Sequence, residues 1–331
     1  MYKTPSLGIL LANTGTPDAP TAKAVRRFLA QFLADPRVIE LPRWKWLPIL
    51  HGIILNTRPR KSAKLYESIW DERGSPLLYH TQDLTMNLEA ELRAHSLEVP
   101  INVAVGMRYG NPSIKEALRE LREKGATHYV VFPLFPQYSS TTSGSIIESV
   151  LSEFTKWRWI PPVQIISDYH DHPAYISAIA ENVRAFWANS PRAEKLLFSF
   201  HGIPKNYVER GDPYEKQCLR TVELLVEELA LSKDEWTLAF QSRFGRSEWL
   251  RPYTNEVLEN LGAENLASLD VLSPGFAVDC LETIGEIGDE GQVSFQNMGG
   301  GAYSYIPALN ATDLHLKALS EIILEKSASL R

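Results

Sequence analysis

The chain has 331 residues, of which 44% are hydrophobic and 22% are charged, and its formal net charge is -6 at pH 7. This length suffices for two domains with a large core, and the composition is that of a soluble globular protein. The negative net charge argues against nucleic acid as a partner, because phosphate binding needs a concentrated excess of Lys and Arg.

The chain contains only two cysteines, Cys218 and Cys280. That count excludes a four-thiolate zinc or iron-sulfur site within one chain, and it favours a reducing compartment. Near the N-terminus a short apolar run leads directly into turn residues, which suits a first buried strand better than a cleaved signal. No run approaches the ~18 apolar residues that span a bilayer. We therefore expect a cytoplasmic protein, with contact at a membrane surface left open.

Short apolar runs recur along the chain, and each is followed by Gly, Pro or Ser and then by a helical pattern. The runs are residues 7–12, 101–105, 128–134, 196–200, 236–240 and 266–272. Strands that alternate with helices are typical of a parallel sheet in an α/β protein. Because the runs fall equally in the two halves of the chain, they predict two similar doubly wound domains rather than one large sheet.

The first run ends in a turn-rich loop, TGTPDAPT, at residues 14–21, and the pattern after it predicts a helix over residues 22–34. A loop at a helix N-terminus can hold an anion. This loop matches neither GxGxxG nor a P-loop, however, and most such loops are simple connections.

Residues 41–66 contain cations without a single Asp or Glu; the cations are Arg43, Lys45, Arg58, Arg60, Lys61 and Lys64. Within this stretch lies an apolar, Trp-bearing segment at residues 44–55. Such a segment between cations fits a lip for a flat apolar ligand or a contact with an anionic membrane. An ordinary core helix with basic flanks fits about as well, although Pro48 and Gly52 interrupt its pattern.

Aromatic and hydroxyl residues follow the next two runs. GMRYGNP, residues 106–112, places Arg108 and Tyr109 after the second run, and FPLFPQYSSTTSGS, residues 132–145, follows the third. Such groups at strand ends suit a broad apolar ligand with a few polar appendages. A capped helix start explains the hydroxyl run equally well.

The run at residues 195–200 delivers His201 at its carboxyl edge. A single histidine on a strand is usually a packed or hydrogen-bonded residue, so only its position favours a functional role. If this strand neighbours the strand at residues 266–272, imidazole and the acids described next would face one crevice.

The stretch SPGFAVDCLETIGEI, residues 273–287, carries Asp279, Glu282 and Glu286 in a pattern that predicts one helix with Ser273 as its cap and Pro274 at its first position. In an α-helix these spacings place the three acids within an arc of roughly 60°. Acids near a helix start often only complement its dipole on a solvated surface. Because the preceding run is apolar enough to be central, and ligands bind at the carboxyl ends of such strands, we favour a functional face.

Several of these segments together resemble the ferrochelatases, enzymes that insert ferrous iron into a porphyrin at the end of haem synthesis. The resemblance covers nearly the whole chain. It rests on LANTGTP at residues 11–17, GMRYGNP, FPQYSSTTSGS, SFHGIP, QSRFGRSEWLRPYT and SPGFAVDCLETIGEI. YIPALNATDLH near the C-terminus is similar to the form found in Gram-negative bacteria.

The resemblance implies roles for particular residues. His201 corresponds to the family's active-site histidine and Glu282 to its essential glutamate, and both are implied as catalytic residues and metal ligands. Asp279 and Glu286 correspond to a proton relay on the acidic face, in a helix that the family widens into a π-type turn. The positions that border the porphyrin or its propionates are Thr14, Tyr66, Ser75, Arg108 and Tyr109.

The implied fold is α/β, with two doubly wound, Rossmann-like domains, parallel sheets and an active-site cleft between them. Residues 1–175 form the N-terminal domain, which carries the porphyrin lip at residues 41–66 and is joined by a C-terminal helix at residues 311–331. Residues 176–310 form the C-terminal domain with His201 and Glu282.

Two departures from the family pattern matter. No cysteine follows Cys280, so we expect neither the [2Fe-2S] cluster of some members nor any other permanent cofactor. Cys280 also stands where many members have histidine, which leaves the local proton or metal path open.

The implied reaction is Fe²⁺ insertion into protoporphyrin IX with release of two protons, a lyase step of haem biosynthesis. Imidazole can accept a pyrrole proton or ligate Fe²⁺, and crowded carboxylates raise one another's pKa. The expected partners are porphyrin and Fe²⁺, without nucleic acid. Peripheral contact with an anionic membrane, at the inner face of the cytoplasmic membrane, is left open, as is the oligomeric state.

Rival interpretations are a coproporphyrin III ferrochelatase, a cobalt chelatase of the same fold and, outside the enzymes, a haem or porphyrin carrier. Acids opposite a histidine argue against a carrier. Taken without the resemblance, the residues support only an α/β protein with a cation or acid-base site, for which a metal-dependent hydrolase is a serious rival.

Overall fold

The structure, a computed structural model, describes residues 5–95, 99–245 and 247–330. The backbone divides into two compact units, of which the first comprises Met1–Asp168 with Leu319–Arg331 and the second comprises Tyr169–Ala318. The long helix α12 (Asp313–Lys326) therefore begins in the second unit and ends in the first, before the short turn η4 (Ala328–Leu330). These boundaries differ by several residues from those expected at residues 175 and 310. The roles assigned to the two domains stay predictions.

The described part of the first unit is built on a parallel sheet with the strand order β2-β1-β3-β4. Its strands are β1 (Leu7–Asn13), β2 (Ile101–Met107), β3 (His128–Pro133) and β4 (Val163–Ile165). β1 is central, since Leu7 pairs with both Ile101 and His128. This register brings the carboxyl ends of the three longer strands to one edge of the sheet.

Helices cover this first sheet. α4 (Pro76–Ala94) and α5 (Ile114–Glu123) both pack against β2, and α6 (Ser145–Phe154) continues from a π-helical turn, η2 (Ser140–Gly144). α5 begins with a capping box in which Ser113 and Glu116 satisfy each other's backbone N–H groups. Its buried residues then face the strands, as the helical pattern requires.

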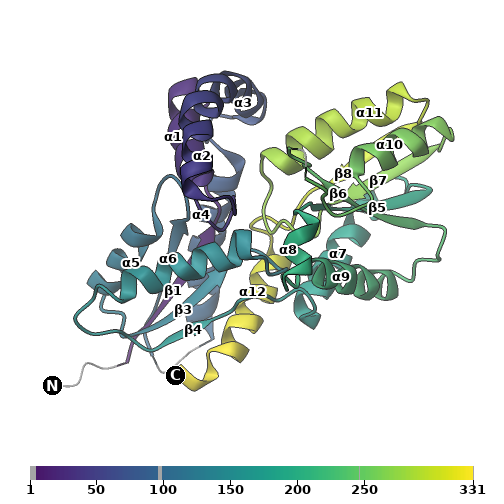
Figure 1. The fold of residues 1–331 in the computed structure, drawn as a ribbon. Helices are drawn as coiled ribbons and strands as arrows, with labels where there is room; N and C mark the ends of the chain where they lie inside the picture. Colours follow the sequence, from purple (N-terminus) through teal and green to yellow (C-terminus); the bar gives the residue numbers. More distant parts are fainter. Residues whose placement is uncertain (1–4, 96–98, 246, 331) are drawn as a thin grey trace. The chain divides into compact units, whose positions relative to one another are not determined.

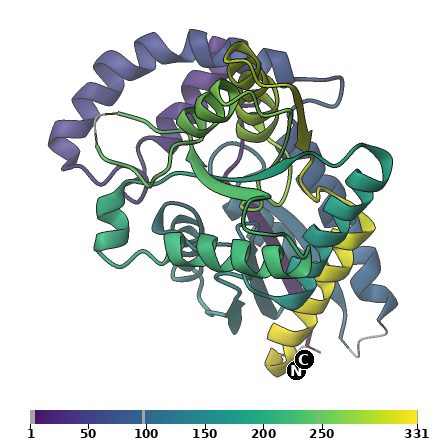
Figure 2. The ribbon, with the colours of Figure 1, turned by 90° about the vertical axis from the view of Figure 1, so that its right-hand side faces the viewer.

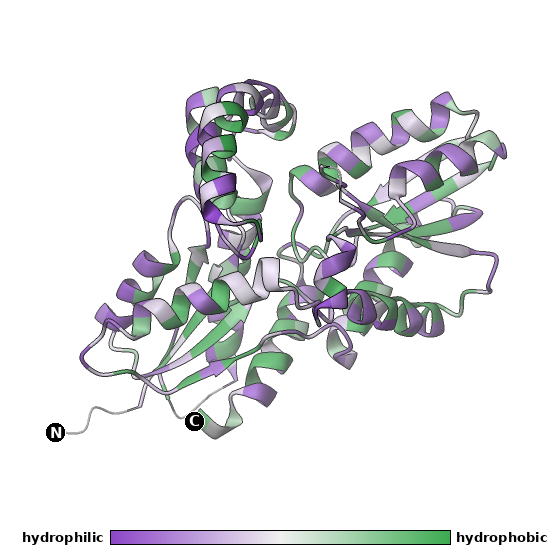
Figure 3. Cartoon of the chain, viewed as in Figure 1, coloured by the Kyte–Doolittle hydropathy of each residue, from purple (hydrophilic) through white to green (hydrophobic). Residues whose placement is uncertain are grey.

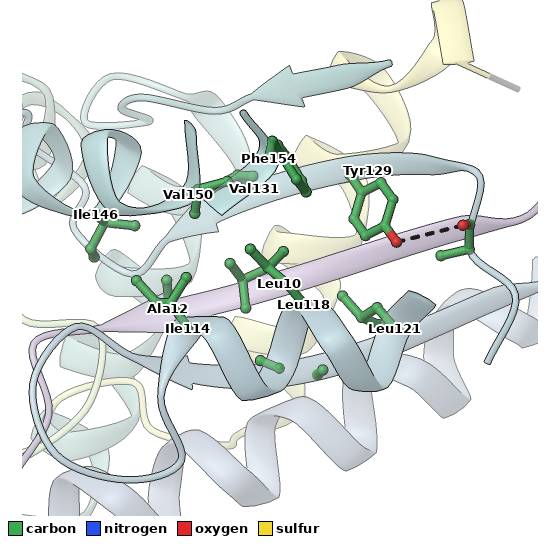
Figure 4. Packing of buried hydrophobic residues seen from close by; sticks show 13 residues of the cluster. Leu10, Ala12, Ile114, Leu118, Leu121, Tyr129, Val131, Ile146, Val150 and Phe154 are labelled. Atoms are coloured by element: carbon green, nitrogen blue, oxygen red, sulfur yellow. Dashed lines mark hydrogen bonds between the residues drawn. The ribbon is translucent and has the colours of Figure 1, made fainter. Parts of the chain in front are cut away.

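The core of this unit lies between the sheet and α5 and α6. Figure 4 shows Leu10 and Val131 on the strands pointing towards Leu118 and Val150 on these helices. Tyr129 and Phe154 meet edge to face with ring centroids 5.1 Å apart, an arrangement that aromatic rings prefer. The cluster is fully apolar apart from the Tyr129 hydroxyl, which donates to the Ala126 carbonyl at 3.5 Å.

A separate layer of helices lies at one end of the first sheet, as Figures 1 and 2 show. It consists of α1 (Ala22–Phe32), α2 (Arg43–Ile49), the π-helical turn η1 (Leu50–Ile54) and α3 (Leu55–Ile69). Thr21 caps α1 by accepting from the Ala24 N–H. The predicted helix at residues 22–34 is thus confirmed.

The segment at residues 44–55 has a buried face and an exposed apolar face. The interpretation as a core helix holds for the buried face, and the role of the exposed face as a lip or membrane contact stays a prediction. Trp46, Leu50 and Leu55 are buried in a small cluster with Leu33, and the Trp46 indole donates to the Leu33 carbonyl at 2.6 Å. Other apolar side chains of the same segment are exposed, namely Trp44 by 75%, Ile49 by 41% and Ile53 by 59%.

The described part of the second unit repeats the plan with the strand order β6-β5-β7-β8, again all parallel. Its strands are β5 (Lys195–His201), β6 (Trp236–Gln241), β7 (Ser268–Leu272) and β8 (Ala302–Ile306). β5 is internal, paired with β6 on one side and β7 on the other. The strand that ends in His201 is therefore the neighbour of the strand that leads to the acidic stretch, which is the condition on which the functional interpretation of His201 depended.

Helices cover both faces of the second sheet (Figure 1). α7 (Pro173–Asn189) and α9 (Tyr214–Glu228) pack together on one face, and α10 (Thr254–Ala263) and α11 (Gly291–Asn297) pack together on the other. The short helix α8 (Lys205–Glu209) follows β5, and a π-helix, η3 (Glu282–Glu290), runs directly into α11. Helices on both faces of a parallel sheet define a doubly wound unit, so the predicted fold class is confirmed.

Sequence reasoning found the longer strands but missed β4 and β8. β4 has three residues and follows two prolines, and β8 follows three consecutive glycines and alternates aromatic and small residues. Both lie at sheet edges, where burial on two faces is not required. They therefore lack the continuous apolar run that identifies a central strand.

Hydrophobic residues, green in Figure 3, concentrate in the strands, whereas the outer helices mix both colours. This distribution is that of buried sheets under amphipathic helices. Among the described residues, none of the helices combines the length and the apolar character that crossing a membrane requires.

Candidate active site

His201 is the last residue of β5 and lies beside Gln241 of β6. The Nδ1 atom of His201 is 2.7 Å from the carbonyl oxygen of Gly202. Because a carbonyl only accepts, this contact assigns the proton to Nδ1 and leaves Nε2 as the basic atom of the neutral ring. The ring of Trp249 lies next to it, with centroids 6.4 Å apart. The structure thus presents a histidine with a defined tautomer at the carboxyl edge of the sheet.

The acidic stretch does not form the single helix expected from residue 273. Residues 273–280 are not helical, and the π-helix η3 begins at Glu282. The Ser273 hydroxyl is buried and has no hydrogen-bond partner among the described residues, so it does not cap a helix. Instead the Asp279 N–H donates to Asn310 Oδ1 at 2.8 Å, and the Asn310 N–H donates to the Ala277 carbonyl at 3.2 Å. Bonds to a distant loop replace the helical bonds that the pattern suggested.

The π-type turn implied for this region is present and carries two of the acids. In a helix with i→i+5 bonding, Glu282 and Glu286 lie close to one face. Burial raises the pKa of Glu286, hydrogen bonds from Ser242 and the charge of His201 oppose the rise, and the charge of Glu282 adds to it. His201 and Glu282 therefore both lie near enough to Glu286 for their charges to act on its pKa. Burial is thus the main cause of the raised pKa of Glu286, and the crowding of acids that we predicted contributes less.

Neighbouring groups hold both glutamates. Ser242 donates to Glu286 twice, from its N–H at 2.8 Å and from its hydroxyl at 2.5 Å. Burial raises the pKa of the Cys280 thiol well above its usual range, and the charge of Glu282 and a hydrogen bond to its carboxylate add to this. The thiol therefore stays neutral and acts as a donor to Glu282.

Asp279 lies outside the helix and in a different environment. Its carboxylate is 5% exposed and accepts from the Thr283 and Tyr305 hydroxyls at 2.9 and 2.7 Å and from the Asn310 amide at 2.7 Å. The Ala308 N–H is a fourth donor at 3.3 Å. The prediction that the three acids share one helical face is therefore wrong for Asp279, because the first turn of the expected helix does not form.

Gln241 is a residue of this region that sequence reasoning missed. Its side chain is 3% exposed; Nε2 donates to the Glu282 carbonyl at 3.0 Å, and Oε1 accepts from the Ser199 hydroxyl at 2.8 Å. Ser199 precedes His201 by two residues on β5. One amide thus connects the strand of the histidine to the helix of the glutamate. A Gln at the end of an apolar run was the available signal.

In the first unit, Arg108 and Tyr109 converge on Asp35, a second residue that was missed. The Arg108 guanidinium pairs with Asp35 at 2.6 Å, and the Tyr109 hydroxyl donates to the same oxygen at 2.8 Å. Ser145 also donates to this oxygen, at 2.6 Å, and accepts from Arg108 Nε. Tyr109 is 2% exposed. Both predicted porphyrin contacts are therefore engaged with a buried carboxylate.

The other predicted porphyrin contacts lie nearby in the same unit. The Thr14 carbonyl accepts from the Tyr109 N–H at 2.9 Å, which places both at the ends of β1 and β2. Ser75, 3% exposed, accepts from the Thr16 hydroxyl at 2.9 Å. Tyr66 lies on α3 against Phe28 and Trp70. Their contact with a porphyrin stays a prediction.

Among residues 5–95, 99–245 and 247–330, no three or more His, Cys, Asp or Glu side chains are grouped so as to hold a metal ion. The metal roles of His201 and Glu282 therefore stay predictions.

Comparison with protein families gives an independent result. A sequence model described as Ferrochelatase matches residues 6–327. Among curated relatives, a protein named Ferrochelatase from Thioalkalivibrio sulfidiphilus is 52% identical over 318 residues, which are 96% of this chain and 86% of the relative. A protein of the same name from Methylococcus capsulatus is 51% identical over 94% of this chain and 94% of its own length. Another, from Nitrosococcus oceani, is 50% identical over 96% of this chain and 86% of its own length.

Among solved structures, SirB from Bacillus subtilis with Fe³⁺ matches with a TM-score of 0.56 at 12% identity, covering 98% of this chain and 96% of that one. The sirohydrochlorin chelatase SirB from Bacillus subtilis subspecies spizizenii in complex with cobalt matches with a TM-score of 0.54 at 13% identity, covering 98% and 95%. At such identities these matches support the fold alone. The family match and the relatives at about half identity show more: the chain belongs to the ferrochelatase family.

Proposed function

We propose that this chain inserts Fe²⁺ into protoporphyrin IX, the last step in forming haem. Membership of the ferrochelatase family supports iron insertion into a porphyrin. The observation that carries the proposal in this chain is geometric: His201 ends β5 beside Gln241 of β6, and Gln241 and Ser242 bond to the Glu282 carbonyl and to the Glu286 carboxylate. Metalation removes two pyrrole protons and adds one dication, so it needs both a base and acidic groups in one place.

His201 is suited to take a pyrrole proton. Its Nδ1–H is committed to the Gly202 carbonyl, so the lone pair lies on Nε2. A neutral imidazole nitrogen with a free lone pair can accept a proton, and the same atom is a ligand for Fe²⁺. We assign His201 as the base of the reaction.

Glu282 and Glu286 are suited to receive the metal substrate and to pass protons. The Cys280 thiol donates to Glu282, and Ser242 donates to Glu286, so both carboxylates are oriented. Because burial raises the pKa of Glu286, this group binds a proton more readily than an exposed glutamate. We assign Glu282 to metal or proton handling and Glu286 to the relay.

The test is the absorbance change on anaerobic mixing of the protein with protoporphyrin IX and Fe²⁺, or Zn²⁺ as an air-stable proxy. The variants are His201→Ala and Glu282→Gln. Glu290→Gln is a matched control, because it makes the same change at an exposed position of the same π-helix. Catalytic metalation by wild type and by the control, with loss in both site variants, is expected. A Glu282→Gln variant with the wild-type rate would remove the assignment of Glu282.

The same assay separates the rival functions. Rates with coproporphyrin III against protoporphyrin IX identify the porphyrin, and rates with Co²⁺ against Fe²⁺ identify the metal. Tight porphyrin binding without metalation identifies a carrier instead of an enzyme. Thr14, Tyr66, Ser75, Arg108 and Tyr109 are proposed to border the porphyrin, and substitution there is expected to raise KM more than it lowers kcat.

We also propose that the protein works at the inner face of the cytoplasmic membrane. The support is a lip on α2 and η1 that exposes Trp44, Ile49 and Ile53 beside the cations Arg43 and Lys45. Apolar side chains flanked by cations bind anionic bilayers.

Sedimentation with vesicles tests the membrane proposal. Trp44→Ser with Ile53→Ser is expected to reduce binding to anionic vesicles, whereas Met86→Ser, an equally exposed apolar side chain on α4, is expected to leave it intact. Equal binding by both variants contradicts the proposal.

The expected absence of a permanent cofactor, including a [2Fe-2S] cluster, is likewise a proposal. Both cysteines are buried and free of disulfides. Iron and acid-labile sulfide in the purified protein, above trace amounts, would contradict it.

A further inference from the structure

Asp279 is held by more donors than a proton relay requires. Two hydroxyls, one amide and one backbone N–H donate to its carboxylate, and all four are neutral. A carboxylate offers about four lone-pair sites. Four donors therefore occupy the sites at which a proton would have to arrive, and an arriving proton must displace one of them.

Asn310 accounts for the position of Asp279. Its Nδ2 donates to Asp279 Oδ2 at 2.7 Å, and its Oδ1 accepts from the Asp279 N–H at 2.8 Å. Its own backbone is committed as well, since its N–H donates to the Ala277 carbonyl and its carbonyl accepts from His315 Nδ1 at 2.6 Å. Asn310 has a φ of +49°, a conformation that Asn tolerates better than most residues. Every polar group of Asn310 thus serves this clamp.

The clamp continues to the first turn of the π-helix through Thr283. The Thr283 hydroxyl donates to Asp279 Oδ1 at 2.9 Å and accepts from the Cys280 N–H at 2.9 Å. Thr283 is fully buried and follows Glu282 directly. The clamp therefore fixes the backbone on one side of Glu282, while Gln241 holds the Glu282 carbonyl on the other.

We propose that Asp279 and Asn310 are positioning residues, which lock the start of the π-helix so that Glu282 is presented in one orientation, and that Asp279 carries no proton in the reaction. This inference rests on the proposed function of Glu282. It predicts that metalation activity depends on the pattern of hydrogen-bond donors and acceptors at residue 279, and that it does not require an ionisable group there.

Exchanging the two side chains tests this prediction. In Asp279→Asn alone, the new NH₂ group meets other donors in either orientation, namely the Asn310 amide in one and the Thr283, Tyr305 and Ala308 donors in the other. In Asn310→Asp alone, two carboxylates face each other. In the double variant Asp279→Asn with Asn310→Asp, the new Asn donates to the new Asp, whose other oxygen still accepts from the N–H of residue 279. The Thr283, Tyr305 and Ala308 donors then meet the amide oxygen. Asp tolerates positive φ as Asn does.

The assay is Zn²⁺ insertion, read as kcat and KM, with a thermal unfolding curve for each variant. Each single variant is expected to lose about 10- to 100-fold in kcat, as for other residues that orient an active-site ligand. The double variant is expected to recover most of that loss, with the pH dependence of kcat of the wild type. Recovery moves the carboxylate to residue 310, so a relay through Asp279 cannot explain it.

Each other outcome decides against the inference. A folded double variant as inactive as Asp279→Asn shows that the carboxylate itself is needed. A double variant that does not fold shows that the exchanged clamp does not reproduce the native one.

Tyr305→Phe gives a second measurement, because it removes only one hydroxyl donor. A lower kcat with an unchanged pH profile is expected, and a shifted profile indicates that Asp279 titrates during the reaction. Wild type without metalation activity overturns the proposed function instead, so the two failures are distinguishable.

Discussion

His315 makes the stability of the second unit depend on pH in a calculable way. It lies on α12 fully buried, with its Nδ1 donating to the Asn310 carbonyl and its ring beside Tyr175. Burial lowers the pKa of His315 from 6.5 to about 4, and the hydrogen bond to Asn310 opposes this only in part. The perturbation we consider is acidification from about pH 7 to about pH 5.

The sign follows from linkage. Because the folded pKa lies below the unfolded one, the unfolded chain takes up the proton first, and the free energy of unfolding falls as pH drops below about 6.5. The fall ends near pH 4, where the folded protein is protonated as well. One pKa unit corresponds to about 1.36 kcal/mol, so the full effect is about 3 kcal/mol, of which about 2 kcal/mol is expressed at pH 5.

Urea unfolding at about pH 7 and about pH 5 measures this effect. His315→Asn is the matched variant, because its amide retains a donor near the position of Nδ1 but does not titrate. We expect wild type to lose about 2 kcal/mol more than the variant over this interval. Carboxylates that titrate in the same range are common to both proteins and cancel in the comparison. Equal losses in the two proteins would refute the reasoning, since they would show that His315 is not the group that takes up the proton.

Two further substitutions are predicted. Asp35→Asn is expected to cost about 3 kcal/mol of unfolding free energy at neutral pH, because it leaves the Arg108 guanidinium without its carboxylate. Burial raises the pKa of Asp35, but hydrogen bonds from Ser145, the Arg37 N–H and Tyr109 outweigh burial, so the pKa is lowered overall. The difference in unfolding free energy between wild type and Asp35→Asn should therefore shrink as the pH falls through that lowered pKa. Gln241→Leu is expected to lower kcat for metalation by about 10- to 100-fold with little change in KM for porphyrin, whereas Gln292→Leu, at an exposed glutamine of α11, should leave kcat unchanged.

The position of His201 could be predicted because it depends on periodicity alone. An apolar run of strand length places the residue that follows it at the carboxyl edge of a parallel sheet. The order of the strands could not be predicted in this way. The pairing of β5 with β7, which brings the histidine next to the acidic stretch, comes from the structure.

The environment of Asp279 could not be predicted in this way. Spacing in an α-helix places it with Glu282 and Glu286, but the bonds that hold it come from Tyr305 and Asn310, more than twenty residues later. The buried position of Asp35 could not be predicted for the same reason, since its partners Arg108 and Ser145 are distant in the chain. Buried polar groups find partners through tertiary structure, and a single sequence does not record those pairs.

The π-helical turns are features of the structure that fall in segments which the sequence had already singled out. Such turns occupy well under 1% of residues in globular proteins, and they occur frequently at functional sites. In the described part of the chain they occur at Leu50–Ile54, Ser140–Gly144 and Glu282–Glu290. All three fall in segments whose composition alone suggested a ligand: the apolar lip, the hydroxyl run after β3 and the acidic stretch.

The same rare backbone form thus occurs at three segments that were chosen on other grounds, although Leu50 of the first turn and Ile287 of the third also pack in buried clusters. A widened turn shifts the side chains after it relative to those before it, and for Glu282 and Glu286 that shift is stabilised by specific bonds from Gln241 and Ser242. The distortion therefore has specific partners in the sequence, and it sets the orientation of the two carboxylates that the proposed reaction uses.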